Sequence, residues 1–194
     1  MTNSLSKVAI YIDGSNFYFS VKNTFKCKVD IEKFCRKLVI NDELIKINYY
    51  IAPVNRMNAP DKYIEQQKFF DKIKEIEKLK IVLGRLEKHK KDGKTFYMEK
   101  ATDINLALDM ILDALDNVYD VAYLISNDGD FSGAVSAVIN RFNKKVIYIA
   151  IGNRKSISYH LKKVASKTLK IGEQFVEEAK LWRYSPICME TCRD

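Results

Sequence analysis

The stretch VAIYIDGSN, Val8–Asn16, leads an uninterrupted apolar run directly into a carboxylate. A second stretch, VAYLISNDGDF, Val121–Phe131, repeats this arrangement. Apolar runs of about five residues bounded by turn formers predict strands that are buried on both faces, as in a parallel sheet covered by helices. Each carboxylate then lies where a strand leaves the core, at the sheet edge where α/β proteins bind ligands. Because carboxylates gathered there repel one another unless neutralised, the pattern predicts a divalent-metal site.

Strand and helix patterns alternate outward from these two stretches, which is typical of a parallel sheet with helices on both faces. We expect Ser15 and Asn16 to cap the first helix, Asp30 the second, and Thr102 the helix that carries Asp103. The expected strands cover residues 7–13, 45–52, 79–86, 121–126, 145–151 and 168–171. The expected helices cover residues 15–25, 31–38, 60–76, 103–115, 131–142 and 156–165.

Two segments fall outside this alternation. Residues 79–99 are rich in lysine and contain an Asp-Gly turn signal, so they are expected to form a basic, projecting hairpin. The body should be one domain, residues 1–171, followed by a tail over 172–194. Phe175, Val176, Leu181 and Trp182 are spaced for an amphipathic helix in this tail. It should pack on the body or on a second copy of the chain, which leaves a homodimer open.

Composition limits the classes of function. No run approaches the roughly 18 to 20 apolar residues that span a bilayer, and the N-terminus lacks a signal-peptide core, so we expect a soluble, cytoplasmic protein with no membrane partner. Four cysteines and two histidines lack paired spacing, which disfavours a structural zinc site. A net charge of +8 is consistent with a polyanionic partner, and equally with ordinary solubility.

Three ordered blocks, Ile12–Asn16, Glu99–Met110 and Ser126–Phe131, resemble the signature blocks of NYN domains, a branch of the PIN-like metal-dependent nucleases. The resemblance covers roughly residues 7–171. It implies a three-layer α/β/α PIN-like fold with a central parallel sheet of order 3-2-1-4-5. It also implies an acidic pocket, between strands 1 and 4, that binds Mg²⁺ or Mn²⁺.

The resemblance also implies roles for individual residues. Asp13, Asp103 and Asp128 would hold the metal, Asp130 would be a fourth acid bound directly or through water, and Asn16 would orient metal or phosphate. The ion would polarise a phosphodiester and activate the attacking water. Taken singly, each acid also fits an ordinary turn or helix cap, so the inference depends on all of them together.

Further candidates are second-tier site residues. Asp109 lies six residues after Asp103 and so points about 120° away around the helix. It would pair with Lys100 or a base of the hairpin, unless it is a solvated helix acid. Ser126 and Lys100 flank the acidic blocks. Asn127 is expected to take the tight turn before Asp128 with a positive φ.

Basic and aromatic side chains are candidates for holding a nucleic acid, although a basic run is often only a solvated face. Tyr18, Tyr50 and Tyr97 could stack on bases, or belong to the core. The basic candidates are Lys88, Lys90, Lys91, Lys94, Arg141, Lys144, Arg154 and Lys155.

Together these patterns favour a metal-dependent endoribonuclease that cleaves single-stranded or loop RNA. The alternative is a catalytically silent RNA-binding or regulatory module that acts through partners. A phosphatase of another α/β family is the least favoured class, because its second Asp is expected at position 15, which is Ser15.

Overall fold

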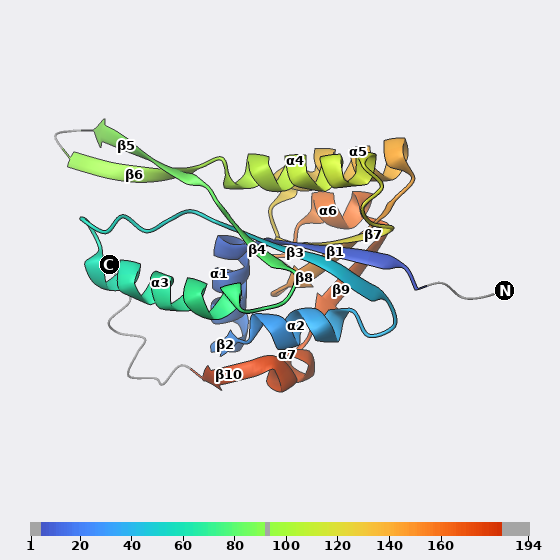
Figure 1. The fold of residues 1–194 in the computed structure, drawn as a ribbon, viewed down its shortest axis with the longest axis horizontal. Helices are drawn as coiled ribbons and strands as arrows, with labels where there is room; N and C mark the ends of the chain where they lie inside the picture. The colour runs from blue at the N-terminus through green and yellow to red at the C-terminus, as the bar shows by residue number, and fades with distance from the viewer. Residues whose placement is uncertain (1–4, 92–93, 184–194) are drawn as a thin grey trace.

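The computed structural model describes residues 5–91 and 94–183, which form a central six-stranded parallel sheet between two layers of helices (Figure 1). Numbered along the chain, the strand order is 3-2-1-4-5-6, so the predicted order 3-2-1-4-5 is present and one further strand extends the edge. In spatial order the strands are β4 (Leu79–Leu83), β3 (Glu43–Ile51), β1 (Lys7–Asp13), β7 (Val121–Ile125), β8 (Lys145–Ile151) and β9 (Lys167–Ile171).

Two apolar clusters lie on opposite faces of the sheet because successive side chains of a strand point to opposite sides. On β1, Ile10 and Ile12 enter one cluster, and Ala9 and Tyr11 enter the other. Helices α1 (Gly14–Phe25), α2 (Ile31–Leu38), α3 (Pro60–Lys74) and α7 (Glu173–Ala179) cover the first cluster. Helices α4 (Thr102–Leu115), α5 (Ser132–Phe142) and α6 (Tyr159–Val164) cover the second. No helix in the described part of the chain is long and apolar enough to cross a membrane.

Of the three helix starts for which the sequence predicts a cap, one has the predicted cap. Asp30 caps α2 by accepting from the Lys33 amide. Helix α1 is capped by Asp13, so the expected caps Ser15 and Asn16 are wrong. Helix α4 begins after Ala101, which has a φ of 72° and no side-chain cap, and Thr102 lies buried within the first turn. The chain turns sharply there as it leaves the hairpin, which a search for capping residues does not detect.

The hairpin is formed by β5 (Arg85–Lys91) and β6 (Lys94–Lys100), and it projects from the body (Figure 1). It is therefore shorter than predicted, because residues 79–83 belong to the central sheet as β4. Gly84 joins the two, and a Cβ there would lie 2.8 Å from the Lys100 carbonyl oxygen. The predicted Asp92-Gly93 turn lies outside the described residues.

The segment after the sheet differs from the helical tail that the sequence predicts. Up to Arg183, where the described part of the chain ends, it is helical only in α7. There the Phe175 ring packs edge to face on the Phe34 ring of α2, with 5.3 Å between the ring centroids. Leu181 and Trp182 lie instead in a strand, β10 (Lys180–Arg183), which pairs antiparallel with β2 (Cys27–Val29). Because β2 and β10 are far apart in sequence and short, no local pattern indicated this second sheet.

Candidate active site

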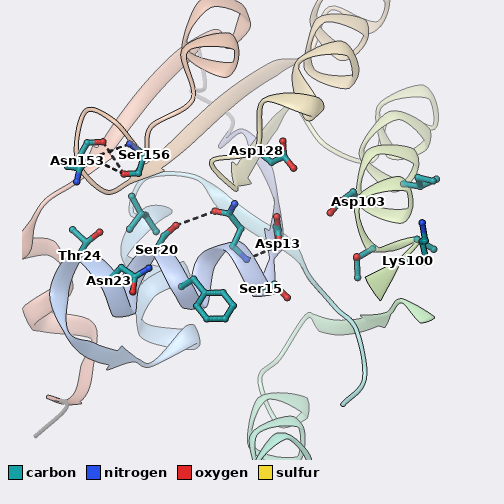
Figure 2. Close-up of a pocket in the computed structure, with 16 residues that line it drawn as sticks. Asp13, Ser15, Ser20, Asn23, Thr24, Lys100, Asp103, Asp128, Asn153 and Ser156 are labelled. Atoms are coloured by element: carbon teal, nitrogen blue, oxygen red, sulfur yellow. Dashed lines mark hydrogen bonds between the residues drawn. The ribbon is translucent and has the colours of Figure 1, made fainter. Parts of the chain in front are cut away.

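The three principal acids come from three different elements and line one cavity of about 1020 Å³ (Figure 2). Asp13 ends β1, Asp128 follows β7, and Asp103 lies in the first turn of α4. Strands β1 and β7 are parallel neighbours with Ile12 opposite Ile125, so their carboxyl ends meet at one edge of the sheet. The structure thus brings together side chains that are up to 115 residues apart, the separation of Asp13 and Asp128.

Ser126 connects two of these acids. Its hydroxyl donates to Asp13 Oδ2 at 2.9 Å and accepts from the Asp128 amide at 3.1 Å. Asp13 Oδ1 accepts from the Asn16 amide at 3.0 Å, so hydrogen bonds hold both carboxylate oxygens of Asp13. Ser126 is 2% exposed, and a buried hydroxyl with both functions in use is fixed in orientation. Asp13 is consequently preorganised at the cavity wall.

Asn127 fixes the end of β7, a role that the sequence did not reveal. Its amide nitrogen donates to the Ile151 carbonyl oxygen at 2.6 Å, and its side-chain oxygen accepts from the Tyr148 hydroxyl at 2.6 Å. Its backbone N–H donates to Asn16 Oδ1 at 3.0 Å. Asn127 is not among the described residues with positive φ, so the expected turn conformation is wrong. Asn127 instead ties β7 to α1 and β8.

Gly14 permits α1 to begin directly beside Asp13. A Cβ at this position would lie 2.5 Å from Tyr49 Cε1 and 2.8 Å from the Tyr50 carbonyl oxygen. The second atom is backbone and has little freedom to move away. The glycine therefore allows the first turn of α1 to pack closely on β3 while Asp13 stays at the cavity.

Some of the remaining predicted site residues line the cavity, and others lie outside it. Asn16 and Lys100 line the cavity, and Lys100 brings a cation to the acids. Asp130 is exposed and does not line it, although its amide donates to Asp128 Oδ1 at 2.9 Å. Asp109 accepts from the Tyr50 hydroxyl at 2.8 Å, inside the layer between α4 and the sheet. Its observed partner is thus not the expected lysine.

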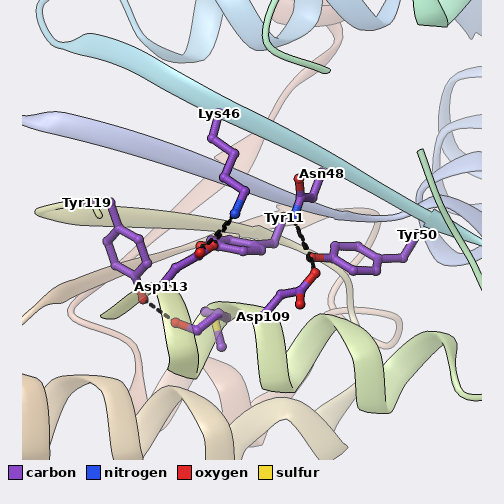
Figure 3. A network of polar contacts seen from close by, with 8 residues as sticks. Tyr11, Lys46, Asn48, Tyr50, Asp109, Asp113 and Tyr119 are labelled. Carbon is purple, nitrogen blue, oxygen red and sulfur yellow. Dashed lines mark hydrogen bonds and ion pairs between the residues drawn. The ribbon is translucent and has the colours of Figure 1, made fainter. Parts of the chain in front are cut away.

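A partly buried polar network links α4 to β1 and β3 (Figure 3). Asp113 of α4 accepts from Tyr11 of β1 at 2.6 Å and from Lys46 of β3 at 2.6 Å. One turn earlier, Asp109 accepts from Tyr50, which also accepts from Asn48 at 2.8 Å. The network fixes α4 against the sheet, and with it the helix start that carries Asp103. Tyr50 is therefore a core residue and not a base-stacking one.

We expect the network to make stability sensitive to alkaline pH. Burial, followed by the hydrogen bond to Asp113, raises the pKa of Tyr11 above its ordinary value, and burial also raises the pKa of Tyr50 and Tyr119. Below about pH 10 these phenols are neutral in both states, and their full contribution is present. Above it the unfolded tyrosines ionise while the folded ones do not, so stability falls by about 1.4 kcal/mol per pH unit per tyrosine.

Urea unfolding at pH 8 to 11 measures this effect. The free energy of unfolding should begin to fall near about pH 8.5, because burial raises the pKa of the Cys35 thiol and only the unfolded thiol ionises there, and it should fall more steeply above about pH 10 as the tyrosines ionise. Tyr11→Phe should give a shallower decline, since one titrating group is gone. An unchanged slope in Tyr11→Phe would contradict the assignment.

The basic candidates lie at both edges of the sheet. Arg154 and Lys155 are exposed between Asn153 and Ser156, which line the acidic cavity. Lys144 forms an ion pair with Asp120 at 3.6 Å, just before β7, so it lies at the edge opposite the cavity.

The other basic candidates lie on α5 and on the two strands of the hairpin. Arg141, in the last turn of α5, is close to the edge opposite the cavity because α5 returns across the sheet before β8 starts. Lys88 and Lys90 are exposed on β5. Lys91 and Lys94 belong to the hairpin strands, but their side chains are outside the described part.

The donor chemistry of the cavity fits a hard divalent cation, because carboxylate oxygens are the ligands that Mg²⁺ and Mn²⁺ prefer. The spacing of the acidic side chains fits a single metal ion less well. Over residues 5–91 and 94–183, no three His, Cys, Asp or Glu side chains are grouped closely enough to hold a metal ion. A shared ion would therefore require the acidic side chains to rearrange.

The sequence profile of the NYN domain matches residues 7–172, most of the chain and all of the central sheet. The chain belongs to the NYN domain family. NYN domains are PIN-like and are generally nucleases that act on RNA, typically with divalent metals. The predicted family is thus confirmed, and so is the α/β fold with a central parallel sheet.

One solved structure supports the fold. A Vibrio parahaemolyticus protein of unknown function superposes with a TM-score of 0.71 at 24% identity, covering 93% of this chain and 99% of that one. A putative oxidoreductase from Parabacteroides merdae reaches a TM-score of only 0.35 at 10% identity, over 88% of this NYN chain and 33% of the other. No curated protein matches the chain. The first similarity extends the fold assignment to nearly the whole NYN chain.

Proposed function

We propose that this NYN protein is a metal-dependent endoribonuclease that hydrolyses RNA phosphodiesters. The observation that carries the proposal is the meeting of Asp13, Asp103 and Asp128 at one cavity, with Ser126 joining two of them. A structural role would satisfy each acid in its own local turn. It would not require acids from three elements to line one cavity at the ligand-binding edge of the sheet.

Asp13, Asp103 and Asp128 would hold Mg²⁺ or Mn²⁺. When bound, such an ion polarises the phosphodiester and makes water a better nucleophile. Ser126 and the Asn16 amide keep the Asp13 carboxylate in place, and Asn127 keeps the end of β7 beside α1. Lys100 offers a positive charge to a phosphate oxygen in the cavity.

Metal removal tests the proposal directly. Purified protein should cleave an unstructured RNA at internal positions with Mg²⁺ or Mn²⁺, stop when EDTA is added, and recover when the ion is restored in excess. Product sizes on a sequencing gel distinguish internal cleavage from trimming of the ends. EDTA removes the cation from the acidic cavity. Cleavage that persists unchanged in EDTA would therefore contradict the metal dependence.

The separation of the acids favours a second candidate, an RNA-binding or regulatory module without catalysis. For this candidate, RNA binding weakens with salt while no cleavage appears with either ion. Calorimetric titration with Mn²⁺ adds a second criterion. Metal binding that disappears in Asp13→Asn supports the nuclease, and no metal binding supports the silent module.

A further inference from the structure

A second cavity of about 500 Å³ opens beside the acidic one and shares Ser15 and Phe19 with it. Its volume is within the ~300–1,000 Å³ typical of small-molecule pockets. The strand-ending loop 52–59, the start of α1 and the hairpin form its walls. This recess is therefore distinct from the candidate active site but adjoins it.

Aromatic side chains line two walls of this recess, the start of α1 and the hairpin. Tyr18 and Phe19 are 40% and 56% exposed, although both belong to a helix whose other aromatic residues pack inward. Tyr97 of β6 lines the same recess from the hairpin. Exposed aromatic rings around a pocket are a signature of ligand contact, because such rings are normally removed from water. Flat ring faces favour flat, stacking ligands such as nucleobases.

The loop wall of the recess is preformed. Gln66 of α3 accepts from the Val54 amide at 2.7 Å and donates to the Ala52 carbonyl oxygen at 3.0 Å. Asn55 accepts from the Met57 amide at 2.8 Å. These hydrogen bonds fix the loop without a ligand, and a preorganised wall lowers the entropic cost of binding.

The hairpin presents positive charge on the face that borders the recess. Leu86 and Tyr97 line the recess, and Lys88 lies directly opposite Tyr97 in the antiparallel ladder, so their side chains share a face. Lys90 is on this face too, two residues further along β5. Both lysines are exposed and suited to phosphates, whereas the acidic cavity beside the recess requires a cation to accept one.

We propose that this recess binds an unpaired nucleobase of RNA, from a nucleotide adjacent to the phosphate held in the acidic cavity. The base stacks on Tyr18 and Tyr97, and the neighbouring phosphates contact Lys88 and Lys90. This inference rests on the proposed function and names its substrate class. Since a paired base has both faces covered by its neighbours, the recess selects single-stranded segments over duplex.

Binding to oligoadenylate, measured by fluorescence anisotropy in EDTA so that no cleavage occurs, tests the base site. Tyr97→Ala and Tyr18→Ala should each weaken binding of a twelve-nucleotide strand by about 5- to 100-fold. Tyr97→Phe should retain the affinity, because it keeps the ring face. Tyr159→Ala is the matched control, since Tyr159 is 71% exposed and lines neither cavity.

An abasic strand of the same length isolates the stacking. Wild type should bind it more weakly than oligoadenylate, and Tyr97→Ala should bind it as wild type does. Lys88→Ala should weaken binding of both strands and reduce the slope of log affinity against log salt by about 1. Lys33→Ala, on the exposed face of α2, should do neither.

The outcomes separate this inference from the proposed function. Equal binding of oligoadenylate by wild type, Tyr18→Ala and Tyr97→Ala, with wild type still cleaving RNA, overturns the base site alone. Equal cleavage of single strands and duplex overturns it as well. A wild-type protein that neither binds nor cleaves RNA overturns both. Thermal melting of each variant excludes misfolding as the cause of a loss.

Discussion

Replacing Asp13 with asparagine should lower the rate of RNA cleavage by roughly 10²- to 10³-fold, the loss typical of removing one charge-stabilising group from an active site. Asparagine is as good a helix cap as aspartate, so α1 should keep its N-terminal hydrogen bond to the Asn16 amide. The substitution removes the charge, and it also replaces the Oδ2 acceptor of the Ser126 hydroxyl with an NH2 donor, so that hydrogen bond has to reverse or break. Cleavage of a fluorescent RNA and the thermal melting temperature, measured on the same preparation, check both halves of this expectation.

Asp30→Asn is the matched control. Asp30 also caps a helix, through the Lys33 amide at 3.1 Å, but it lies outside the acidic cavity. Its substitution should leave cleavage within about twofold of wild type, because asparagine also caps a helix and the residue lies away from the acidic cavity. Equal activity in Asp13→Asn and wild type would refute the catalytic role of Asp13.

Replacing Asp113 with alanine should destabilise the protein by about 3 kcal/mol, near the lower end expected when one partner of a buried ion pair is removed. The lower end applies because the Lys46 and Asp113 side chains are 28% and 15% exposed. The substitution leaves the Lys46 ammonium and the Tyr11 hydroxyl without their acceptor. The midpoint of urea unfolding measures the change.

Two further variants test the cause of this loss. Asp116→Ala, at the exposed C-terminal cap of the same helix, should change stability by less than about 0.5 kcal/mol. The double variant Lys46→Met with Asp113→Leu should be more stable than Asp113→Ala, because neither partner of the ion pair is left behind as a lone charge. A double variant as unstable as Asp113→Ala would show that the lone ammonium is not what costs stability.

The sequence predicted the sheet and the meeting of the acids because both follow from short-range pattern and general topology. Buried apolar runs identified β1 and β7, and the strand order implied by the resemblance to NYN domains placed their carboxyl ends side by side. Asp103 was found only through the resemblance to NYN domains, since a helix acid has no strand end to mark it. Short sequence blocks that resemble those of NYN domains thus predicted most of the site.

What could not be predicted depends on side chains that are distant in sequence. Asn127 was interpreted by its backbone, but its amide group contacts residues on α1 and β8. Lys144 follows the acidic block in sequence but lies at the opposite edge, because α5 carries the chain back across the sheet. Sequence proximity is a poor guide wherever a helix reverses the direction of the chain.

The hairpin leaves and rejoins the body at facing positions, since Arg85 pairs directly with Lys100. The hairpin could therefore be replaced by a short link from Gly84 to Ala101. Such a link would leave every strand of the central sheet unaltered. Under the proposed function, changes in this hairpin should alter which RNA the protein prefers, because Tyr97 and Lys88 belong to it. An engineer who wishes to retarget the protein should begin there.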